Sequence, residues 1–113
     1  IGLAFLLRYA SERVAVPVQG GRFDLEAVLK LLASRGINEV QLEAGATLAG
    51  AFLSAGLVDE LLLYIAPVLL GERARPLFDG LHIDAMTERL QLHAVDSRRI
   101  GDDHRLLLRP VAD

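Results

Sequence analysis

The chain has 113 residues, of which 52% are hydrophobic and 24% are charged, and its formal net charge at pH 7 is −3. This composition is typical of one globular domain and excludes a disordered chain, while the negative charge argues against nucleic-acid binding, which needs an excess of Lys and Arg. The lack of cysteine excludes a disulfide framework, a thiol nucleophile and a cysteine-ligated metal site.

No apolar run is long enough for a membrane span, and no signal peptide is expected. The sequence starts without Met inside an apolar run, Ile1 to Leu7. This start fits either a trimmed chain or a fragment of a longer protein, and we favour the fragment. We also expect the protein to be cytoplasmic.

The first predicted elements are short. Residues 1–9 fit either a short helix or a buried strand, because so short an apolar run has no decisive period. Residues 13–18 alternate and contain Pro17 near their end, which favours a short edge strand. Gly20 and Gly21 predict a turn after it.

A helix is predicted over residues 24–35. Asp24 can cap it, an apolar stripe repeats at helical spacing, and Gly36 follows at the position where helices end. Residues 38–43 then predict a strand.

The second half of the chain is predicted to alternate in the same way. A second helix is expected over residues 47–55, and a central strand over residues 60–66, because a continuous apolar run is typical of a strand covered on both faces. Residues 72–80 predict an irregular loop. Residues 90–100 and 105–109 predict an antiparallel hairpin. The order indicates an α/β fold with a mixed sheet.

Small residues cluster at the predicted strand-to-helix turn from Glu43 to Gly50. Gly45 lets the backbone turn tightly and lets a ligand come close. The N–H groups that begin the next helix suit a phosphate or pyrophosphate, and the hydroxyl of Thr47 either caps the helix or bonds to a phosphate oxygen. The alternative is close packing of helix on sheet, without a ligand.

Glu43 lies at the carboxyl end of the predicted strand, where open α/β sheets bind ligands. Its carboxylate can accept hydrogen bonds from sugar hydroxyls or influence the charge at a reacting carbon. The alternative is an ordinary surface residue at a strand end. Arg73 and Arg75 either meet a phosphate or are solvated loop residues. We predict no metal site, because the three histidines, His82, His93 and His104, do not have the spacing of metal ligands. We assign no catalytic residue.

Three stretches in close succession identify a family resemblance. They are VQLEAGATLAG over residues 40–50, AGLVDELLLYIAP over residues 55–67, and LLGERARPLF over residues 69–78. Together they resemble the reductase domain of the bacterial bifunctional riboflavin-biosynthesis deaminase/reductase. The resemblance runs from about Gly20 to the C-terminus.

The resemblance implies a dihydrofolate-reductase-like fold and a reaction. The family uses NADPH to reduce the ribose of 5-amino-6-(5-phosphoribosylamino)uracil to a ribityl chain. By this resemblance Glu43 contacts the phosphoribosyl pyrimidine substrate. The implied cofactor-binding residues are Gly45, Ala46, Thr47, Leu48, Ala49, Gly50 and Ala51.

The chain also departs from the family. Residues 1–113 correspond to a single, partial reductase domain, without the family's zinc-containing deaminase domain. Val68 stands where many relatives have Lys, and Ala44 replaces a second Gly. Because an incomplete sheet exposes edges and apolar faces, we expect self-association into a homo-oligomer or a partner segment that completes the sheet. The alternatives are a related reductase of another substrate and a non-catalytic dimerisation module.

Overall fold

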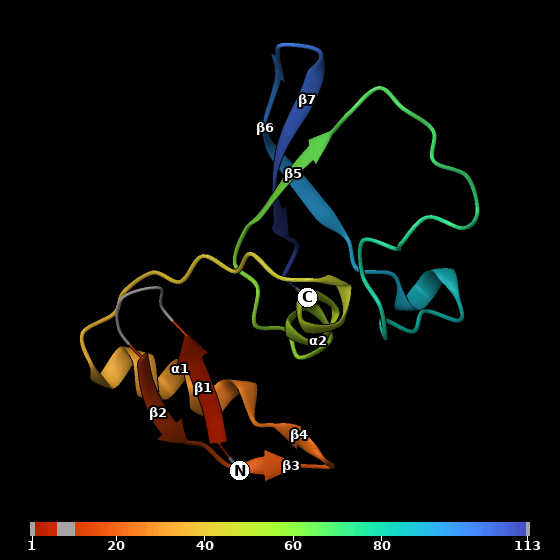
Figure 1. Ribbon diagram of the computed structural model, residues 1–113. Helices are drawn as coiled ribbons and strands as arrows, with labels where there is room; N and C mark the ends of the chain where they lie inside the picture. Colours follow the sequence, from red (N-terminus) through yellow and green to blue (C-terminus); the bar gives the residue numbers. More distant parts are fainter. Residues whose placement is uncertain (1, 7–10, 113) are drawn as a thin grey trace. The chain divides into compact units, whose positions relative to one another are not determined.

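The computed structural model describes the backbone of residues 2–6 and 11–112 and the side chains from Ala15 to Ala112. The chain divides into two compact units, Ile1–Leu42 and Glu43–Asp113, which are described separately. Figure 1 shows the order of the elements along the chain. Of the ambiguous stretch 1–9, residues 2–6 form a strand, and residues 1 and 7–9 lie outside the described residues.

The first unit begins with two antiparallel pairs of strands. β1 (Gly2–Leu6) pairs with β2 (Ser11–Ala15). β3 (Val18–Gln19) then pairs with β4 (Arg22–Phe23). The predicted turn between β3 and β4 is confirmed: Gly20 and Gly21 have φ angles of 58° and 75°, which residues with a side chain rarely adopt.

The single strand predicted over residues 13–18 is wrong in its bounds. β2 ends at Ala15, and β3 starts only at Val18. Pro17 lies between them and has no N–H group to continue a ladder. Its carbonyl instead accepts a hydrogen bond of 2.8 Å from the backbone N–H of Asp24.

Helix α1 (Leu25–Ser34) confirms the prediction for residues 24–35. The carboxylate of Asp24 accepts a hydrogen bond of 3.1 Å from the backbone N–H of Ala27, so it satisfies a donor that the helix leaves open. Gly36 ends the helix with a φ of 81°. On the apolar stripe, Val28 is only 5% exposed.

The strand predicted over residues 38–43 is not formed. The backbone there carries no strand assignment, and Val40 and Leu42 are exposed. An apolar, β-favouring segment becomes a strand only when a neighbouring strand accepts its N–H and C=O groups. Within the described residues, no strand pairs with this segment.

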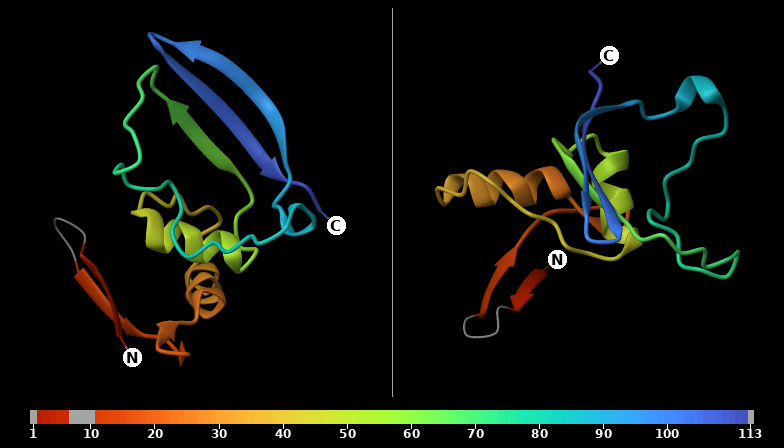
Figure 2. Two further views of the ribbon diagram at one scale, coloured as in Figure 1. Left: turned by 90° about the vertical axis from the view of Figure 1, so that its right-hand side faces the viewer. Right: turned by 90° about the horizontal axis from the view of Figure 1, so that it is seen from above.

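The second unit holds helix α2 (Ala46–Ser54) and a three-stranded antiparallel sheet. The strands are β5 (Leu61–Ile65), β6 (Leu92–Ile100) and β7 (Asp103–Pro110). Figure 2 shows β7 lying between β5 and β6. The α/β class is confirmed, although every strand pair described here is antiparallel, so the parallel pair of a mixed sheet is not formed.

The prediction of a central strand over residues 60–66 is wrong in position. Among the described strands, β5 pairs only with β7 and therefore lies at an edge of this sheet. Leu62, Tyr64 and Ile65 are exposed. A continuous apolar run indicates that a strand can be buried on both faces. It does not indicate that this unit contains the helices or strands that would bury it.

The predicted C-terminal hairpin is confirmed. β6 and β7 pair antiparallel around a turn at Gly101 and Asp102, with one register shift between Ala94 and Asp96. An ion pair of 3.0 Å joins Arg109 of β7 to Glu60, the residue before β5. Between β5 and β6 the chain is irregular, as predicted for residues 72–80, except for a short 3₁₀ helix, η1 (Met86–Glu88).

Candidate functional site

The start of α2 is open. Gly45 is the N-cap residue, and no side chain forms a capping hydrogen bond there. The first N–H groups of a helix have no acceptor within the helix, and they carry partial positive charge. Thr47 does not cap the helix, so the prediction that its hydroxyl could be the cap is wrong. Its side chain is exposed in the first turn, close to these donors.

Gly45 has an ordinary backbone conformation, with a φ of −68° and a ψ of 173°. Any residue can adopt these angles, so the prediction that Gly45 serves to let the backbone turn tightly is wrong. A methyl group built on Gly45 would meet no atom within 4 Å. What the missing side chain provides is open space directly beside the free N–H groups of α2.

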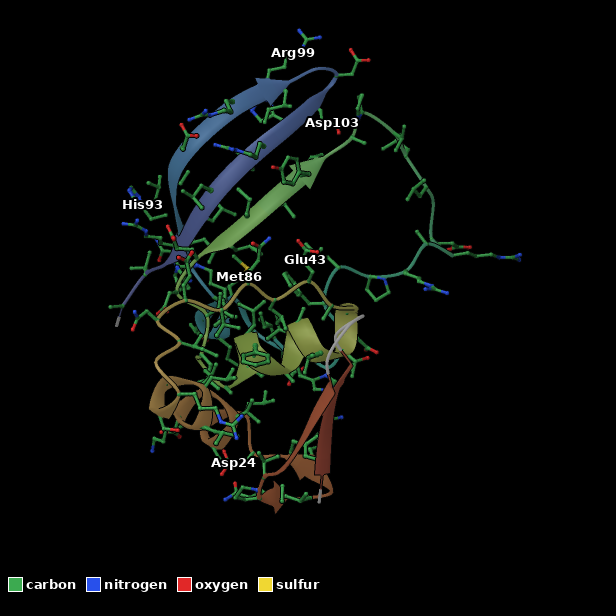
Figure 3. The ribbon with its side chains drawn as sticks, turned by 60° about the vertical axis from the view of Figure 1, so that its left-hand side comes forward. Asp24, Glu43, Met86, His93, Arg99 and Asp103 are labelled. Atoms are coloured by element: carbon green, nitrogen blue, oxygen red, sulfur yellow. The ribbon has the colours of Figure 1, made fainter. Side chains whose placement is uncertain are left out.

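Glu43 lies two residues before this N-cap and is exposed. Figure 3 shows it on the extended segment that leads into α2. It does not end a strand, because residues 38–43 form none. The chain therefore brings a carboxylate and an uncapped helix start within a few residues of one another by local sequence alone.

The predicted cofactor-binding stretch divides by exposure. Gly45, Thr47 and Leu48 are exposed, whereas Ala46, Ala49 and Ala51 are half-buried. The exposed members lie at the first turn of α2, where an anion can reach the backbone. The helix predicted over residues 47–55 thus begins one residue earlier than expected, and the pattern of residue types did not separate the exposed members of this stretch from the half-buried ones.

Gly50 differs from the rest of the stretch because it is buried. A methyl group built on Gly50 would lie 3.2 Å from both the carbonyl carbon and the amide nitrogen of Asp79, and closer still to its carbonyl oxygen. The backbone of the second-unit loop thus crosses α2 at this residue. This crossing joins positions 29 residues apart, and no local pattern in the sequence signals it.

The other candidate residues are not gathered at the start of α2. Arg73 and Arg75 lie exposed on the loop that follows β5. On the hairpin, Ser97 Oγ lies 2.9 Å from Nε2 of His104, a pair that sequence reasoning missed. Within the described residues, no three His, Asp or Glu side chains lie close enough to hold a metal ion.

A charged cluster on the hairpin was also missed. Asp96 accepts hydrogen bonds from Nε of Arg98 at 2.8 Å and from Nη2 of Arg105 at 3.1 Å. These two bonds, that from Arg98 first, lower the pKa of the Asp96 carboxyl from its ordinary value. The register of the predicted hairpin contains the signal, because it sets Arg98 directly opposite Arg105.

Comparison with solved structures defines the class of protein. The RibD structure of Acinetobacter baumannii (form 2) matches with a TM-score of 0.74 and 37% sequence identity, over 80% of this chain and 27% of that one. The chain thus has the α/β, dihydrofolate-reductase-like fold that the resemblance implied.

Within the described residues, no helix has the length and apolar character needed to cross a membrane.

Sequence comparison defines the family. The profile of the RibD C-terminal domain matches residues 6–106, and the chain belongs to this family. The riboflavin biosynthesis protein RibD of Escherichia coli is 42% identical over 88 residues, which cover 78% of this chain and 24% of that protein. The 5-amino-6-(5-phosphoribosylamino)uracil reductase of Buchnera aphidicola is 34% identical over 118 residues, or 96% of this chain and 57% of that protein. The chain therefore spans less than two thirds of the length of these relatives.

Proposed function

We propose that this chain forms part of an NADPH-dependent reductase of riboflavin biosynthesis. The reaction is reduction of the ribose of 5-amino-6-(5-phosphoribosylamino)uracil to the ribitylamino product. The observation that carries the proposal is the uncapped start of α2 beside the open space at Gly45. Family membership and the names of the relatives support the choice of reaction.

The residues at the first turn of α2 fit a dinucleotide. A pyrophosphate needs several N–H donors, partial positive charge and room for close approach, and this turn offers all three. The backbone of Ala46, Thr47 and Leu48 would bind the phosphate oxygens, and the Thr47 hydroxyl would add one donor. NADPH, when bound, supplies the hydride. The contribution of these residues is to hold it in a fixed position.

Glu43 is proposed to bind the sugar part of the substrate. Its exposed carboxylate can accept hydrogen bonds from ribose hydroxyls. Such contacts orient the ribose carbon toward the cofactor, which is the main requirement of a hydride transfer. The name of the Buchnera aphidicola relative supports a phosphoribosyl pyrimidine as the bound molecule.

Titration of the purified chain with NADPH, followed by calorimetry, tests the proposal, with NADH titrated in parallel. We expect saturable binding of NADPH that is lost in Gly45→Val. Because the position has an ordinary φ and free space, this substitution should leave the fold intact, which circular dichroism checks. No binding by the folded wild-type chain, or equal binding by Gly45→Val, would contradict the proposed cofactor site.

Two alternatives stay open to test. A panel of phosphoribosyl pyrimidines and folates separates this reaction from that of a related reductase. A non-catalytic module would instead associate without any affinity for NADPH. Three exposed apolar side chains after β5 favour self-association: they are Val68, Leu69 and Leu70. Analytical ultracentrifugation tests whether the chain self-associates.

The cytoplasmic location of the protein also stays a prediction.

A further inference from the structure

The loop between β5 and β6 returns to α2 at one short segment, residues 78–80, which we call the strap. The backbone of Asp79 lies against Gly50, where no side chain intervenes. Gly50 is buried at this crossing, and Phe78, the residue before Asp79, is half-buried. The neighbouring loop residues Arg75, Pro76 and Leu77 are exposed. The strap is thus a local attachment point of an otherwise solvated loop.

The strap is attached to the first turn of α2 as well as to its middle. The backbone N–H of Asp79 donates a hydrogen bond of 3.1 Å to the carbonyl oxygen of Ala46, the first residue of the helix. In an α-helix the same carbonyl accepts the N–H of Gly50 four residues later. One carbonyl therefore joins the strap, the first helical turn and Gly50.

This arrangement separates two roles within the predicted cofactor-binding stretch. Gly45 borders open space, whereas the space beside Gly50 is filled by backbone. A ligand can approach the first of these glycines, but at the second the Asp79 backbone occupies the place of a side chain. Gly50 therefore influences a ligand only through the turn that the strap holds.

We propose that Gly50 is a positioning residue: it seats the strap, and the strap holds the first turn of α2 in the orientation that binds the cofactor phosphates. This inference rests on the proposed function. A preorganised set of N–H donors binds an anion without having to reorganise, so a displaced turn costs affinity even when every donor is still present. Gly50 then belongs to the site without touching the ligand.

The test uses Gly50→Ala and Asp79→Pro, which disturb the same contact from opposite sides. Alanine adds a methyl group against the strap backbone, and proline removes the N–H that bonds to Ala46. Alanine is also the better helix former, so a loss cannot come from helix propensity. Ser54→Ala, at the exposed last residue of α2, is the matched control.

Two quantities are measured for each variant: affinity for NADPH by calorimetry, and amide hydrogen exchange by NMR. We expect both strap variants to bind NADPH roughly ten- to a hundredfold more weakly. In Gly50→Ala the Asp79 amide should also exchange roughly tenfold faster. Amides of the β6–β7 hairpin should keep their protection, and Ser54→Ala should behave as the wild-type chain does.

The remaining outcomes overturn the inference. Wild-type affinity in Gly50→Ala, or unchanged exchange at Asp79, would show that the strap does not position the turn. Loss of protection in the hairpin as well would make Gly50 a residue of general stability. A wild-type chain that binds no NADPH would contradict the proposed function itself, and this inference with it. Binding by the wild-type chain with unaltered strap variants would contradict only the inference.

Discussion

Asp96 and Arg105 are joined across the C-terminal hairpin, with Nη2 of Arg105 donating to Oδ2 of Asp96 at 3.1 Å. The same carboxylate oxygen accepts Nε of Arg98 at 2.8 Å. Since Arg98 and Arg105 are directly opposite in the β6–β7 register, their like charges would otherwise repel. One carboxylate therefore compensates two guanidinium groups on one face of the sheet.

Replacing Asp96 with Asn is expected to lower the midpoint of thermal unfolding. The amide keeps the shape of the side chain but loses the negative charge that compensates the positive charges of Arg98 and Arg105. Circular dichroism at neutral pH measures the change. Asp102→Asn is the control, because its carboxylate is almost fully exposed and lies 3.9 Å from the Arg99 guanidinium. An equal effect of the two substitutions would contradict the role of the cluster.

The contribution of Asp96 to stability is expected to depend on pH. Its pKa is lower in the folded chain than its ordinary value of 3.8, because the ionised form is hydrogen-bonded by Arg98 and Arg105. The stabilisation is therefore fully present above the unfolded pKa of about 4 and is lost as the pH falls through the lower, folded pKa. Urea unfolding of the wild type and Asp96→Asn should differ at pH 7 and converge as the pH is lowered below about 4. A constant difference across this range would refute the prediction.

Thr47→Val is expected to weaken binding of NADPH roughly tenfold, because it removes one hydrogen-bond donor to a charged phosphate while it keeps the side-chain shape. The Thr47 hydroxyl does not cap α2, so its loss should leave the helix itself unaffected. Calorimetry measures the affinity. Thr47→Ser keeps the hydroxyl and should bind as the wild type does; equal affinities for all three proteins would exclude a phosphate contact.

Glu43→Gln is expected to raise the KM for the phosphoribosyl substrate and to leave the affinity for NADPH unchanged. The amide is a weaker acceptor for ribose hydroxyls than the carboxylate, while the start of α2 keeps its donors. Steady-state kinetics with a fixed, saturating concentration of NADPH measures the KM. A change confined to NADPH affinity would place Glu43 at the cofactor instead.

Asp24→Ala is expected to destabilise the chain by about 1 kcal/mol, because it leaves the Ala27 N–H without its capping acceptor. Urea unfolding followed by circular dichroism measures the loss. Asp24→Asn is the control, since the amide oxygen can accept the same hydrogen bond. If asparagine were as destabilising as alanine, the effect would come from the charge at the helix start rather than from the cap.

Elements with local causes were predictable from the sequence. Asp24 and Gly36 bound α1 because a cap and a left-handed C-terminal glycine act within one turn of the helix. The β6–β7 hairpin was predictable for a similar reason, since its turn residues lie between two adjacent strands. The position of the α2 start also followed from the neighbouring small residues.

Elements that depend on distant neighbours were not predictable. The segment 38–43 has a strand-like pattern but forms no ladder, and β5 has the composition of a central strand but lies at an edge. In both cases the pattern reports what the segment can pair with or pack against. Whether such a partner is present is decided elsewhere in the chain.

The sequence by itself determined the family, the bounds of α1, the C-terminal hairpin and the helix start offered to a phosphate, because each depends on residues close together along the chain. Only the tertiary structure decided that Gly45 faces open space while Gly50 lies beneath the backbone of Asp79. The two glycines share one helix and one motif, and a pattern of residue types cannot tell them apart. Their surroundings differ because a loop 29 residues further along the chain crosses only one of them.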